Sequence, residues 1–338
     1  MSEAPEFVPL TAEELQEFFT EYEILSFIAA GGMGSVYLAR DYTSKKKVAI
    51  KVLPRELSDD EEFSSQFRAE AKVMSKLNHP NLIGFHYLNK VADMFYIVME
   101  LVDGKSLHHS AYGEAIDQYT ALKLVMGLAS GVEHAHQAGI LHRDIKPANI
   151  LLDQNAFPKL GDFGLARPVE ESEEGKVIYG TPGYTAPEVI DNPGAIDERS
   201  DIYSVGAILY ELLTGHLPKE KYVPPSKLLA VEPVFDRVVQ KALATEPGMR
   251  YSSMGAFLED LNAIKNGFDE SNPPEPEPTA PTPVEEVKIK KLTPSVTSLH
   301  PERETVQRYT KTKKSPFLWV IIAFALIAVV AGGVFFLK

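Results

Sequence analysis

Two short stretches of the chain carry the residue types best suited to chemistry. The first reads His142-Arg143-Asp144-Ile145-Lys146-Pro147-Ala148-Asn149, and the second reads Asp162-Phe163-Gly164. Two carboxylates and an amide in this order suit the coordination of a hard cation by oxygen ligands. Asp162 and Asn149 are therefore candidate Mg²⁺ ligands, and Asp144 is the candidate acceptor for the proton of an attacking hydroxyl. Any one of these residues has an equally good structural explanation, whereas the complete ordered set favours catalysis.

A lysine and a glutamate form a second candidate group. Lys51 ends the hydrophobic run from Val48, and Glu70 lies three residues after Phe67 and four before Met74. This spacing puts the Glu70 carboxylate on the apolar face of a helix. A carboxylate that points toward a core is costly unless a cation pairs with it, and Lys51 is the natural partner. The alternative is that Lys51 is a solvated charge at a strand edge. Beside a glycine loop, a Lys–Glu pair would neutralise nucleotide phosphates.

A glycine-rich segment precedes this pair. It reads Ala29-Ala30-Gly31-Gly32-Met33-Gly34-Ser35-Val36, and glycines let backbone N–H groups approach an anion closely. A dinucleotide-binding turn requires a helix after the glycines, but a β-branched strand follows here. A P-loop is excluded as well, since Gly104-Lys105-Ser106 has Met99 where that motif needs its first glycine. Most glycine-rich stretches are turns, so this segment gains weight only from its neighbours.

The spacing of apolar residues predicts the elements that position these groups. Three short apolar runs predict strands, at 36–39, 48–53 and 95–101. A helix is expected to begin near Ser58, where Glu61 completes a capping box. Two longer helices are expected over 120–137 and 201–214, because a glycine follows each of these periodic runs. These patterns predict an α+β protein with a strand-rich small lobe followed by a helical large lobe.

Composition narrows the range of partners. The 338 residues are 44% hydrophobic and 24% charged, which is ordinary for a globular protein with a sizeable core. A formal net charge of −13 argues against nucleic acid as a partner, because phosphate binding needs clustered Lys and Arg. The chain has no cysteine, so disulfides, thiolate zinc sites and cysteine nucleophiles are excluded. Residues 1–23 are acidic and lack the pattern of a secretory signal.

The carboxyl-terminal part predicts a tether and a membrane helix. Residues 268–316 are Pro-rich and then basic, without apolar periodicity, which predicts a disordered linker with an r.m.s. span of roughly 40 Å. Residues 317–337 carry no charge and are long enough to cross a hydrocarbon core of about 30 Å, the alternative being a buried core helix. More lysines precede this run than follow it, so we expect a single-pass membrane protein with its large domain cytoplasmic and its C-terminus outside. The small-xxx-small spacing of Ala328 and Gly332 suggests a homodimer.

The motifs together resemble those of the protein kinase family. The resemblance covers about residues 22–265 and implies a two-lobed protein kinase fold that binds ATP with Mg²⁺, Mn²⁺ being an alternative ion. It implies that Asp144 is the catalytic base and that Lys146 steadies the γ-phosphate. Lys51, paired with Glu70, would bind the α- and β-phosphates. The implied metal ligands are Asn149 and Asp162.

The same resemblance implies further binding and structural residues. Met99 corresponds to the gatekeeper beside the adenine, and Glu100 and Val102 provide the hinge. The remaining residues of the implied nucleotide site are Ala29, Gly31, Gly32, Gly34, Val36, Ala49 and Leu151. The implied structural residues are Glu188, its partner Arg250, and Asp201, which braces the catalytic loop.

The branch of the family and the domain organisation follow from the same motifs. Lys146-Pro147-Ala148-Asn149 and Gly180-Thr181 resemble the Ser/Thr branch, and the loop and C-terminal helix resemble bacterial Ser/Thr kinases of the PknB-like type. Two features depart from the family pattern: Ala29 replaces the first glycine of the loop, and residues 216–229 leave little room for a docking helix. The expected parts are an N-terminal extension (1–21), a kinase domain (22–267, with lobes 22–103 and 104–267), a linker (268–316) and a transmembrane helix (317–337).

The candidate regulatory residues surround the activation loop. In the family, an arginine in the place of Arg143 accompanies control by activation-loop phosphorylation, and Ser172 and Thr181 are candidate sites. Ser172 is embedded in an acidic run of Glu170, Glu171, Glu173 and Glu174. We hypothesise that these acids supply the negative charge of a phosphate and make the kinase partly constitutive. The alternative is a solvated run of charges.

Three functions compete for this sequence. The first is a membrane-anchored Ser/Thr kinase that acts on protein substrates. The second is a pseudokinase, an ATP-binding scaffold expected to lack Lys51, Asp144 or Asp162, all of which are present. The third is a small-molecule phosphotransferase, which the Gly180-Thr181 and Ala186-Pro187-Glu188 segments argue against, because they resemble the segments that shape a protein-substrate groove. The sequence favours the first function.

Overall fold

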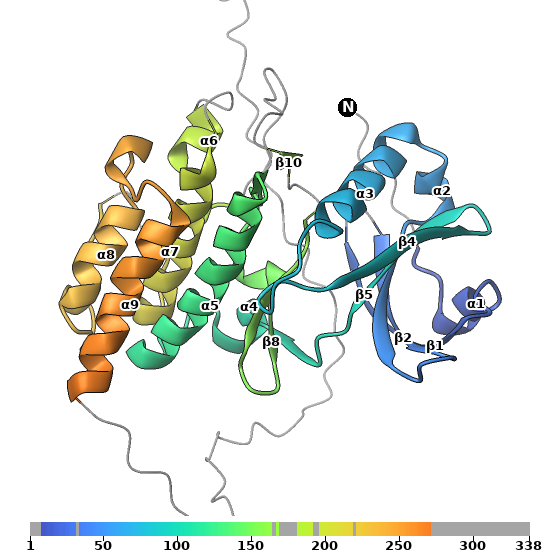
Figure 1. The fold of residues 1–338 in the computed structure, drawn as a ribbon, viewed down its shortest axis with the longest axis horizontal. Helices are drawn as coiled ribbons and strands as arrows, with labels where there is room; N and C mark the ends of the chain where they lie inside the picture. The colour runs from blue at the N-terminus through green and yellow to red at the C-terminus, as the bar shows by residue number, and fades with distance from the viewer. Residues whose placement is uncertain are drawn as a thin grey trace, which may run out of the picture.

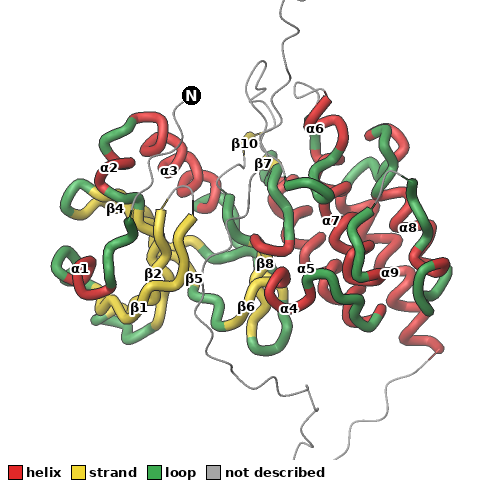
Figure 2. The backbone as a smooth tube through the Cα atoms, turned by 180° about the vertical axis from the view of Figure 1, so that it is seen from behind, coloured by secondary structure: helices red, strands yellow, loops and turns green. Residues whose placement is uncertain are grey.

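The chain folds into a strand-rich lobe and a helical lobe (Figure 1). The computed structural model describes residues 8–31, 34–163, 167–168, 181–191, 196–218 and 221–271. The strands of the small lobe and the helices of the large lobe are separate in the chain as well as in space (Figure 2). The two-lobed α+β architecture predicted from the sequence is therefore confirmed for these residues.

The small lobe is built on a five-stranded antiparallel sheet with the order β1-β2-β3-β5-β4. Its strands are β1 (Tyr22–Gly31), β2 (Gly34–Asp41), β3 (Lys47–Val52), β4 (Phe85–Val91) and β5 (Met94–Glu100). The apolar runs predict β2, β3 and β5 to within a few residues. They do not predict the edge strands β1 and β4, because most side chains of these strands are at least partly exposed and form no buried β-branched run.

A helix covers each face of this sheet. The helices of the small lobe are α1 (Ala12–Gln16), α2 (Arg55–Ser58) and α3 (Glu61–Met74). Successive residues of a strand point to opposite faces. Ile97 of β5 therefore packs with Phe67 of α3, whereas its neighbour Val98 belongs to the cluster that contains Leu15 of α1. The sheet thus has a separate small core on either side.

The start of α3 differs from the prediction. The expected capping box of Ser58 and Glu61 does not form, because Ser58 lies within α2 and its hydroxyl donates to a backbone carbonyl. Asp60 caps α3 instead, by accepting a hydrogen bond from Glu62 N at 2.9 Å. The predicted apolar face is buried, with Phe67 in the cluster against the sheet and Met74 in the core cluster of the large lobe.

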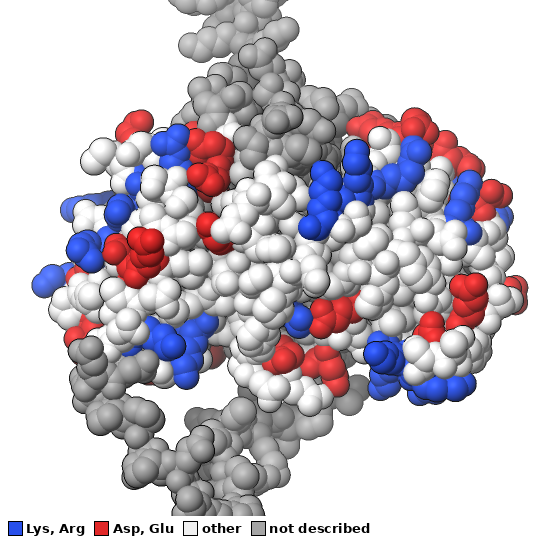
Figure 3. All heavy atoms as spheres, viewed as in Figure 1, with Lys and Arg blue, Asp and Glu red and all other residues white. Residues whose placement is uncertain are grey.

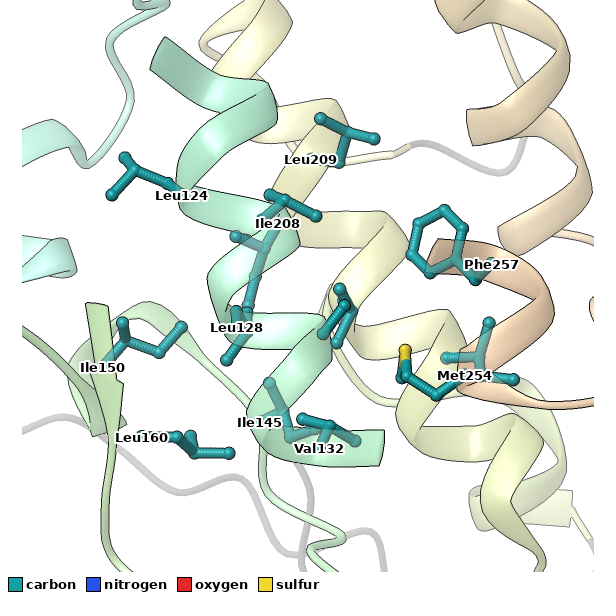
Figure 4. Packing of buried hydrophobic residues seen from close by; sticks show 14 of the residues in the cluster. Leu124, Leu128, Val132, Ile145, Ile150, Leu160, Ile208, Leu209, Met254 and Phe257 are labelled. Carbon is teal, nitrogen blue, oxygen red and sulfur yellow. The ribbon is translucent and has the colours of Figure 1, made fainter. Parts of the chain in front are cut away.

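The large lobe is a bundle of helices packed around α7. Its helices are α4 (Leu107–Ala111), α5 (Gln118–Gln137), α6 (Pro187–Asp191), α7 (Glu198–Thr214), α8 (Val234–Ala242) and α9 (Met254–Ser271). The side chains of Leu128, Ile208 and Phe257 come from α5, α7 and α9 and belong to one buried cluster (Figure 4). Nearly every residue of α7 is buried, as expected for a helix that others surround. Gly215 ends α7 with a φ of 72°, the left-handed conformation typical of a helix end.

Short strands occupy the side of the large lobe that faces the sheet. They are β6 (Gly104–Ser106), β7 (Ile140–Leu141), β8 (Ile150–Asp153), β9 (Pro158–Leu160) and β10 (Arg167–Pro168). β6, β8 and β9 form one small sheet, and β7 pairs with β10. The loop that contains Asp144 runs between β7 and the 3₁₀ turn Pro147–Asn149, so strand pairing on both sides holds it in place.

Two expectations concern segments without long helices. Between α7 and α8, residues 215–218 and 221–233 contain one 3₁₀ turn, Pro225–Lys227, and no α-helix, in agreement with the short segment noted in the sequence. Across the ranges that the structure describes, no helix is both long enough and apolar enough to span a bilayer. The predicted membrane helix at 317–337 lies outside those ranges, as does most of the predicted linker, whose first residues belong to α9.

Candidate active site

A buried ion pair joins the sheet to α3. Lys51 lies on β3, and its Nζ is 2.7 Å from both carboxylate oxygens of Glu70. The Lys51 side chain is 15% exposed and the Glu70 side chain only 2%. Burial acts to lower the pKa of Lys51, but the Glu70 carboxylate outweighs this effect and raises that pKa. Lys51 is therefore a cation held in a defined position beside the large lobe.

A buried aspartate organises the loop that leads to Asp144. Asp201 near the start of α7 accepts backbone N–H bonds from His142 and Arg143, each at 2.9 Å, and its Oδ2 lies 2.8 Å from Nε2 of His136. Burial acts to raise the pKa of Asp201, but its hydrogen bond and charge interaction with His136 outweigh burial and lower that pKa. These contacts hold the loop in a conformation in which Arg143 has a φ of 68°.

The Asp144 carboxylate is in contact with three polar side chains. Lys146 Nζ lies 3.1 Å from Asp144 Oδ2, and Asn149 Nδ2 donates to the same oxygen at 3.1 Å. A second hydrogen bond joins Asn149 Nδ2 to Asp144 O at 2.8 Å. The Thr181 hydroxyl donates to the other carboxylate oxygen, Oδ1, at 3.4 Å. Cationic and amide donors therefore orient one oxygen and leave the other facing a hydroxyl, which is the geometry a general base requires.

Asp162 lies beside the buried ion pair. Its Oδ1 is 3.8 Å from Lys51 Nζ, and its side chain is 54% exposed. Its φ of 57° turns the chain sharply at this residue, a backbone strain that often marks functional positions. Phe163 follows it and is buried, with its ring centroid 4.9 Å from that of His142. The buried phenylalanine thus anchors an exposed carboxylate.

Asn149 and Asp162 fit a bound Mg²⁺. Asn149 uses its amide nitrogen to hold Asp144, so its carbonyl oxygen is the atom left to coordinate an ion. The N–H of Gly161 donates to Asn149 O at 2.9 Å, which ties the two candidate ligands together through the backbone. Within the described ranges no group of three or more His, Cys, Asp or Glu side chains is arranged so that it could hold a metal ion. Two oxygen donors suit Mg²⁺, which usually takes its other ligands from water and phosphates.

Gly34 is the loop position at which the structure requires glycine. Its φ is 143°, and a Cβ at this position would lie 2.2 Å from Val52 O. A Cβ at Gly31 would meet nothing within 4 Å. Gly32 lies outside the described residues. The hairpin between β1 and β2 therefore depends on close contact between Gly34 and β3.

The other residues of the implied nucleotide site lie on several strands of the two lobes and on the segment that follows β5. Ala29 pairs with Val36 across the β1–β2 hairpin, and Ala49 pairs with Met99 across β3 and β5. Leu151 is half-buried on β8. The last residue of β5 is Glu100, and half-buried Val102 follows where the chain leaves the sheet.

The side chain of Glu100 is bound by neighbouring residues of the chain and is not free to contact a nucleotide base. Its carboxylate accepts from Lys159 Nζ at 3.0 Å and from Gly84 N at 3.1 Å. Its own N–H donates to Gly84 O at 2.7 Å. The carbonyl of Glu100 and the backbone of Val102 are accordingly the groups at this hinge that a nucleotide base could use.

A second buried ion pair stabilises the large lobe. Arg250 donates to the two carboxylate oxygens of Glu188 at 2.6 and 2.7 Å, and the Ser200 hydroxyl donates to Glu188 at 2.8 Å. Burial acts to raise the pKa of Glu188, but the hydrogen bonds from Arg250 outweigh it and lower that pKa. This pair ties α6, which follows Thr181, to the segment between α8 and α9.

Of the predicted regulatory residues, the structure describes Thr181 and Arg143 but not Ser172. Ser172 lies outside the described ranges, together with its acidic neighbours. Thr181, considered in the sequence as a phosphorylation site, lies against Asp144 instead of standing alone on the surface. The Arg143 backbone N–H is bound to Asp201, and its side chain is partly buried.

Sequence reasoning missed the histidines that support the site. His136 contacts Asp201 from 65 residues away, and His142 Nε2 lies 3.1 Å from Gly161 O. His142 stands next to the recognised motif, so its position was a usable signal. His136 lies in the last turn of α5, where no local pattern points to Asp201, so only the fold reveals the contact.

Comparison with known proteins gives a consistent result. Residues 22–246 match the family described as "Protein kinase domain". Serine/threonine-protein kinase PknB of Mycolicibacterium smegmatis is 35% identical over 276 residues, which cover 75% of this chain and 44% of the relative. Serine/threonine-protein kinase PrkC of Bacillus subtilis is 33% identical over 342 residues, which cover 92% of this chain and 52% of the relative. The chain spans about half the length of the curated relatives it matches.

Solved structures share the fold. A double mutant of the PknI kinase domain of Mycobacterium tuberculosis has a TM-score of 0.59 and 28% sequence identity. The match covers 73% of this chain and 97% of that one. The unmutated PknI kinase domain gives a TM-score of 0.57 at 27% identity, with 72% of this chain and 96% of that chain covered.

Proposed function

The chain belongs to the protein kinase family, and from this premise we propose that it transfers the γ-phosphoryl group of ATP to serine and threonine hydroxyls of proteins. One observation carries the proposal: Lys51, while paired with Glu70 at 2.7 Å, lies only 3.8 Å from Asp162. The cation for the phosphates and the carboxylate for the metal ion are thus together in one arrangement. The names of PknB and PrkC as Ser/Thr kinases support the choice of acceptor.

The residues of the site have separate tasks in this reaction. The substrate hydroxyl would donate to Asp144 Oδ1, which takes up its proton as the oxygen attacks the γ-phosphorus and the bond to the β–γ bridging oxygen breaks. Lys146, 3.1 Å from the other carboxylate oxygen, offsets negative charge at the transferred group. Lys51 holds the remaining phosphates. Mg²⁺ held by Asn149 and Asp162 would supply further charge neutralisation.

A pseudokinase is the alternative function. It would be expected to have lost one of the three charged residues that the reaction needs, or to hold them apart. Here Lys51, Asp144 and Asp162 are all present, and each has the contacts that its task requires. These contacts favour catalysis over a purely scaffolding role.

We also propose that residues 317–337 anchor this kinase in a bacterial membrane. The kinase domain would lie in the cytoplasm and the C-terminus outside. Two copies would form a homodimer through Ala328 and Gly332. The uncharged run supports the anchor, and the similarity to PrkC extends over 92% of this chain, beyond the kinase domain. A reporter fused after residue 338 that remains cytoplasmic would argue against this topology. Gly332→Ile is expected to lower self-association in a membrane reporter assay, and an unchanged signal would argue against the dimer.

Regulation by the acidic run is a further part of the proposal. Glu170, Glu171, Glu173 and Glu174 would take the place of an activating phosphate. Supporting this, the helix that carries Glu70 has the exposed cations Arg68 and Lys72, Lys76 is exposed in the turn that follows, and basic side chains gather over α3 in Figure 3. A variant with the four glutamates changed to glutamine should lose activity, and full activity without phosphorylation would contradict the proposal.

The test of catalysis is phosphate transfer by the full chain. Purified wild type, Asp144→Asn and Asp93→Asn are incubated with γ-labelled ATP, Mg²⁺ and a generic basic protein. Asp93 lies in the exposed turn between β4 and β5 with a φ of 68°, so the same chemical change there should leave activity intact. We expect phosphoserine or phosphothreonine with wild type and Asp93→Asn, and a loss of at least about 100-fold with Asp144→Asn. Tight ATP binding with no transfer by wild type would favour the scaffold.

A further inference from the structure

A cavity in the small lobe takes no part in the reaction described above. It has a volume of about 150 Å³ and lies on the sheet face that α1 covers, opposite α3 and Glu70. Its walls include the apolar residues Leu10, Leu15, Val52 and Met94, and also Arg55 and Glu56, which carry opposite charges. A cavity of about this volume lined by apolar side chains is large enough for a molecule of the size of benzene.

One polar atom in the wall has no partner. Ser35 is 2% exposed, and its Oγ makes no hydrogen bond of normal length with any residue that the structure describes. Tyr37 is near enough for Ser35 to affect the pKa of its hydroxyl, but that hydroxyl donates its proton to Leu10 O at 2.7 Å. Leaving a buried hydroxyl without a hydrogen-bond partner is unfavourable, so Ser35 Oγ points to a ligand that would satisfy it.

The second wall of the cavity is firmly attached. Residues 8–18 supply this wall, and the hydrogen bond from Tyr37 to Leu10 O links it to β2. Gln16 of α1 donates to Phe19 O at 2.7 Å and to Tyr22 O at 3.1 Å. It also accepts from Ile24 N at 2.7 Å. One side of this open pocket is therefore formed by an N-terminal segment that hydrogen bonds hold to the sheet.

The cavity borders two residues of the nucleotide site. Ser35 follows Gly34, and Val52 follows Lys51. The backbone at Gly34 also packs directly against Val52 O. A molecule that contacts Ser35 and Val52 would restrain the hairpin and the phosphate-binding lysine from the opposite face of the sheet.

We propose that this cavity binds a small neutral amphipathic molecule, a single ring or a branched chain with one hydroxyl or carbonyl group, and that its binding strengthens nucleotide binding. The apolar part would fill the space between α1 and the sheet. The polar group would pair with Ser35 Oγ. Binding stands independently of the proposed kinase activity, whereas the coupling to nucleotide rests on it.

The test uses the methyl signal of Met94, which reports directly from the cavity wall. Full chain carrying ¹³C-methyl methionine is titrated with phenol and with benzene, and the Met94 signal is assigned with Met94→Leu. We expect saturable shifts of this signal with both probes. Ser35→Ala should weaken phenol about 10-fold, the value of one hydrogen bond, and leave benzene unchanged. Ser65→Ala, on the exposed face of α3, is the matched control and should change neither affinity.

Each contrary outcome overturns a defined part of the proposal. No shift at Met94 with either probe would show that the cavity binds no such molecule. A shift seen only after deletion of residues 1–7 would show that the chain itself occupies the space. An equal loss for both probes in Ser35→Ala would remove the assigned hydrogen bond. For the coupling, saturating phenol should raise the affinity for ATP, and ATP the affinity for phenol, by the same factor. An unchanged ATP affinity would overturn the coupling, whereas absent ATP binding with intact phenol shifts would instead overturn the proposed function.

Discussion

Replacing Arg250 with methionine tests how strongly one buried ion pair stabilises the large lobe. The Arg250 side chain is 0% exposed and that of Glu188 is 10% exposed, with N–O distances of 2.6 and 2.7 Å. Methionine keeps much of the length and volume but removes the charge and every donor. Glu188 then keeps the hydroxyl of Ser200, at 2.8 Å, and its own backbone N–H as donors, both of them uncharged. The variant therefore buries a carboxylate without its cation.

The expected loss can be worked from these contacts. Removing one partner of a buried pair costs about 3–5 kcal/mol, because the other charge remains buried and uncompensated. Arg250 also donates to the backbone oxygens of Arg199, Ala244 and Thr245, which lose a donor as well. New apolar burial by methionine offsets part of this. We expect the free energy of unfolding to fall by about 4 kcal/mol, a large share of a total of about 5–15 kcal/mol.

The assay is urea unfolding followed by far-ultraviolet circular dichroism near neutral pH. Arg237→Met is the matched control, because the Arg237 side chain is 74% exposed and only reaches Asp260 at 3.9 Å. It should cost less than about 1 kcal/mol. A loss in Arg250→Met no larger than that of the control would refute the reasoning.

The pH dependence gives a second check. Because the pKa of Glu188 is lowered in the folded state, its contribution is present above the ordinary value of 4.5 and is lost as pH falls through the folded pKa. The difference between wild type and Arg250→Met should therefore shrink on acidification below pH 4.5. A difference that grew instead would contradict the assigned ion pair.

Three further predictions concern the glycine loop, the contact of His136 with Asp201, and Thr181 beside the proposed base Asp144. Gly34→Ala should raise the KM for ATP about 10-fold or more, because a Cβ would lie 2.2 Å from a backbone oxygen, whereas Gly31→Ala, with nothing within 4 Å, should change it little; equal effects would count against the steric argument. Burial acts to lower the pKa of His136, but Asp201 outweighs burial and raises that pKa. The contribution of this contact to the free energy of unfolding is therefore fully present below pH 6.5 and is lost as pH rises through the folded pKa. Urea midpoints of His136→Gln should lack this decline, and the explanation fails if the decline persists. Thr181→Val should lower kcat about 10-fold without changing the KM for ATP, because it removes the hydroxyl 3.4 Å from the proposed base; steady-state kinetics with an unchanged kcat would exclude that contribution.

Local spacing was enough to predict the pairing of Lys51 with Glu70. Helical periodicity placed Glu70 on an apolar face, and a carboxylate on such a face requires a cation. The structure joins the two at 2.7 Å across 19 residues. Similar arguments predicted the strands β2, β3 and β5, whose buried residues leave a clear apolar pattern.

The same approach was wrong where a local motif had more than one outcome. Ser58 and Glu61 have capping-box spacing, but the chain forms α2 first and Asp60 caps α3. Edge strands β1 and β4 escaped prediction because their side chains are mostly outside the core. The ends of helices and the edge strands of a sheet depend on residues that are close in space but distant in the sequence.

The amino-acid sequence by itself determined the chemical groups of this protein, their order and the faces of the helices and strands that carry them, because these follow from residue type and from periods of two and 3.6 residues. Only the tertiary structure decided which distant groups meet. The contact of His136 with Asp201, the approach of Thr181 to Asp144 and the cavity beside Ser35 each join segments that no periodicity relates. Such contacts are set by how the lobes pack, since packing selects one arrangement of neighbours from the many that the same local patterns permit.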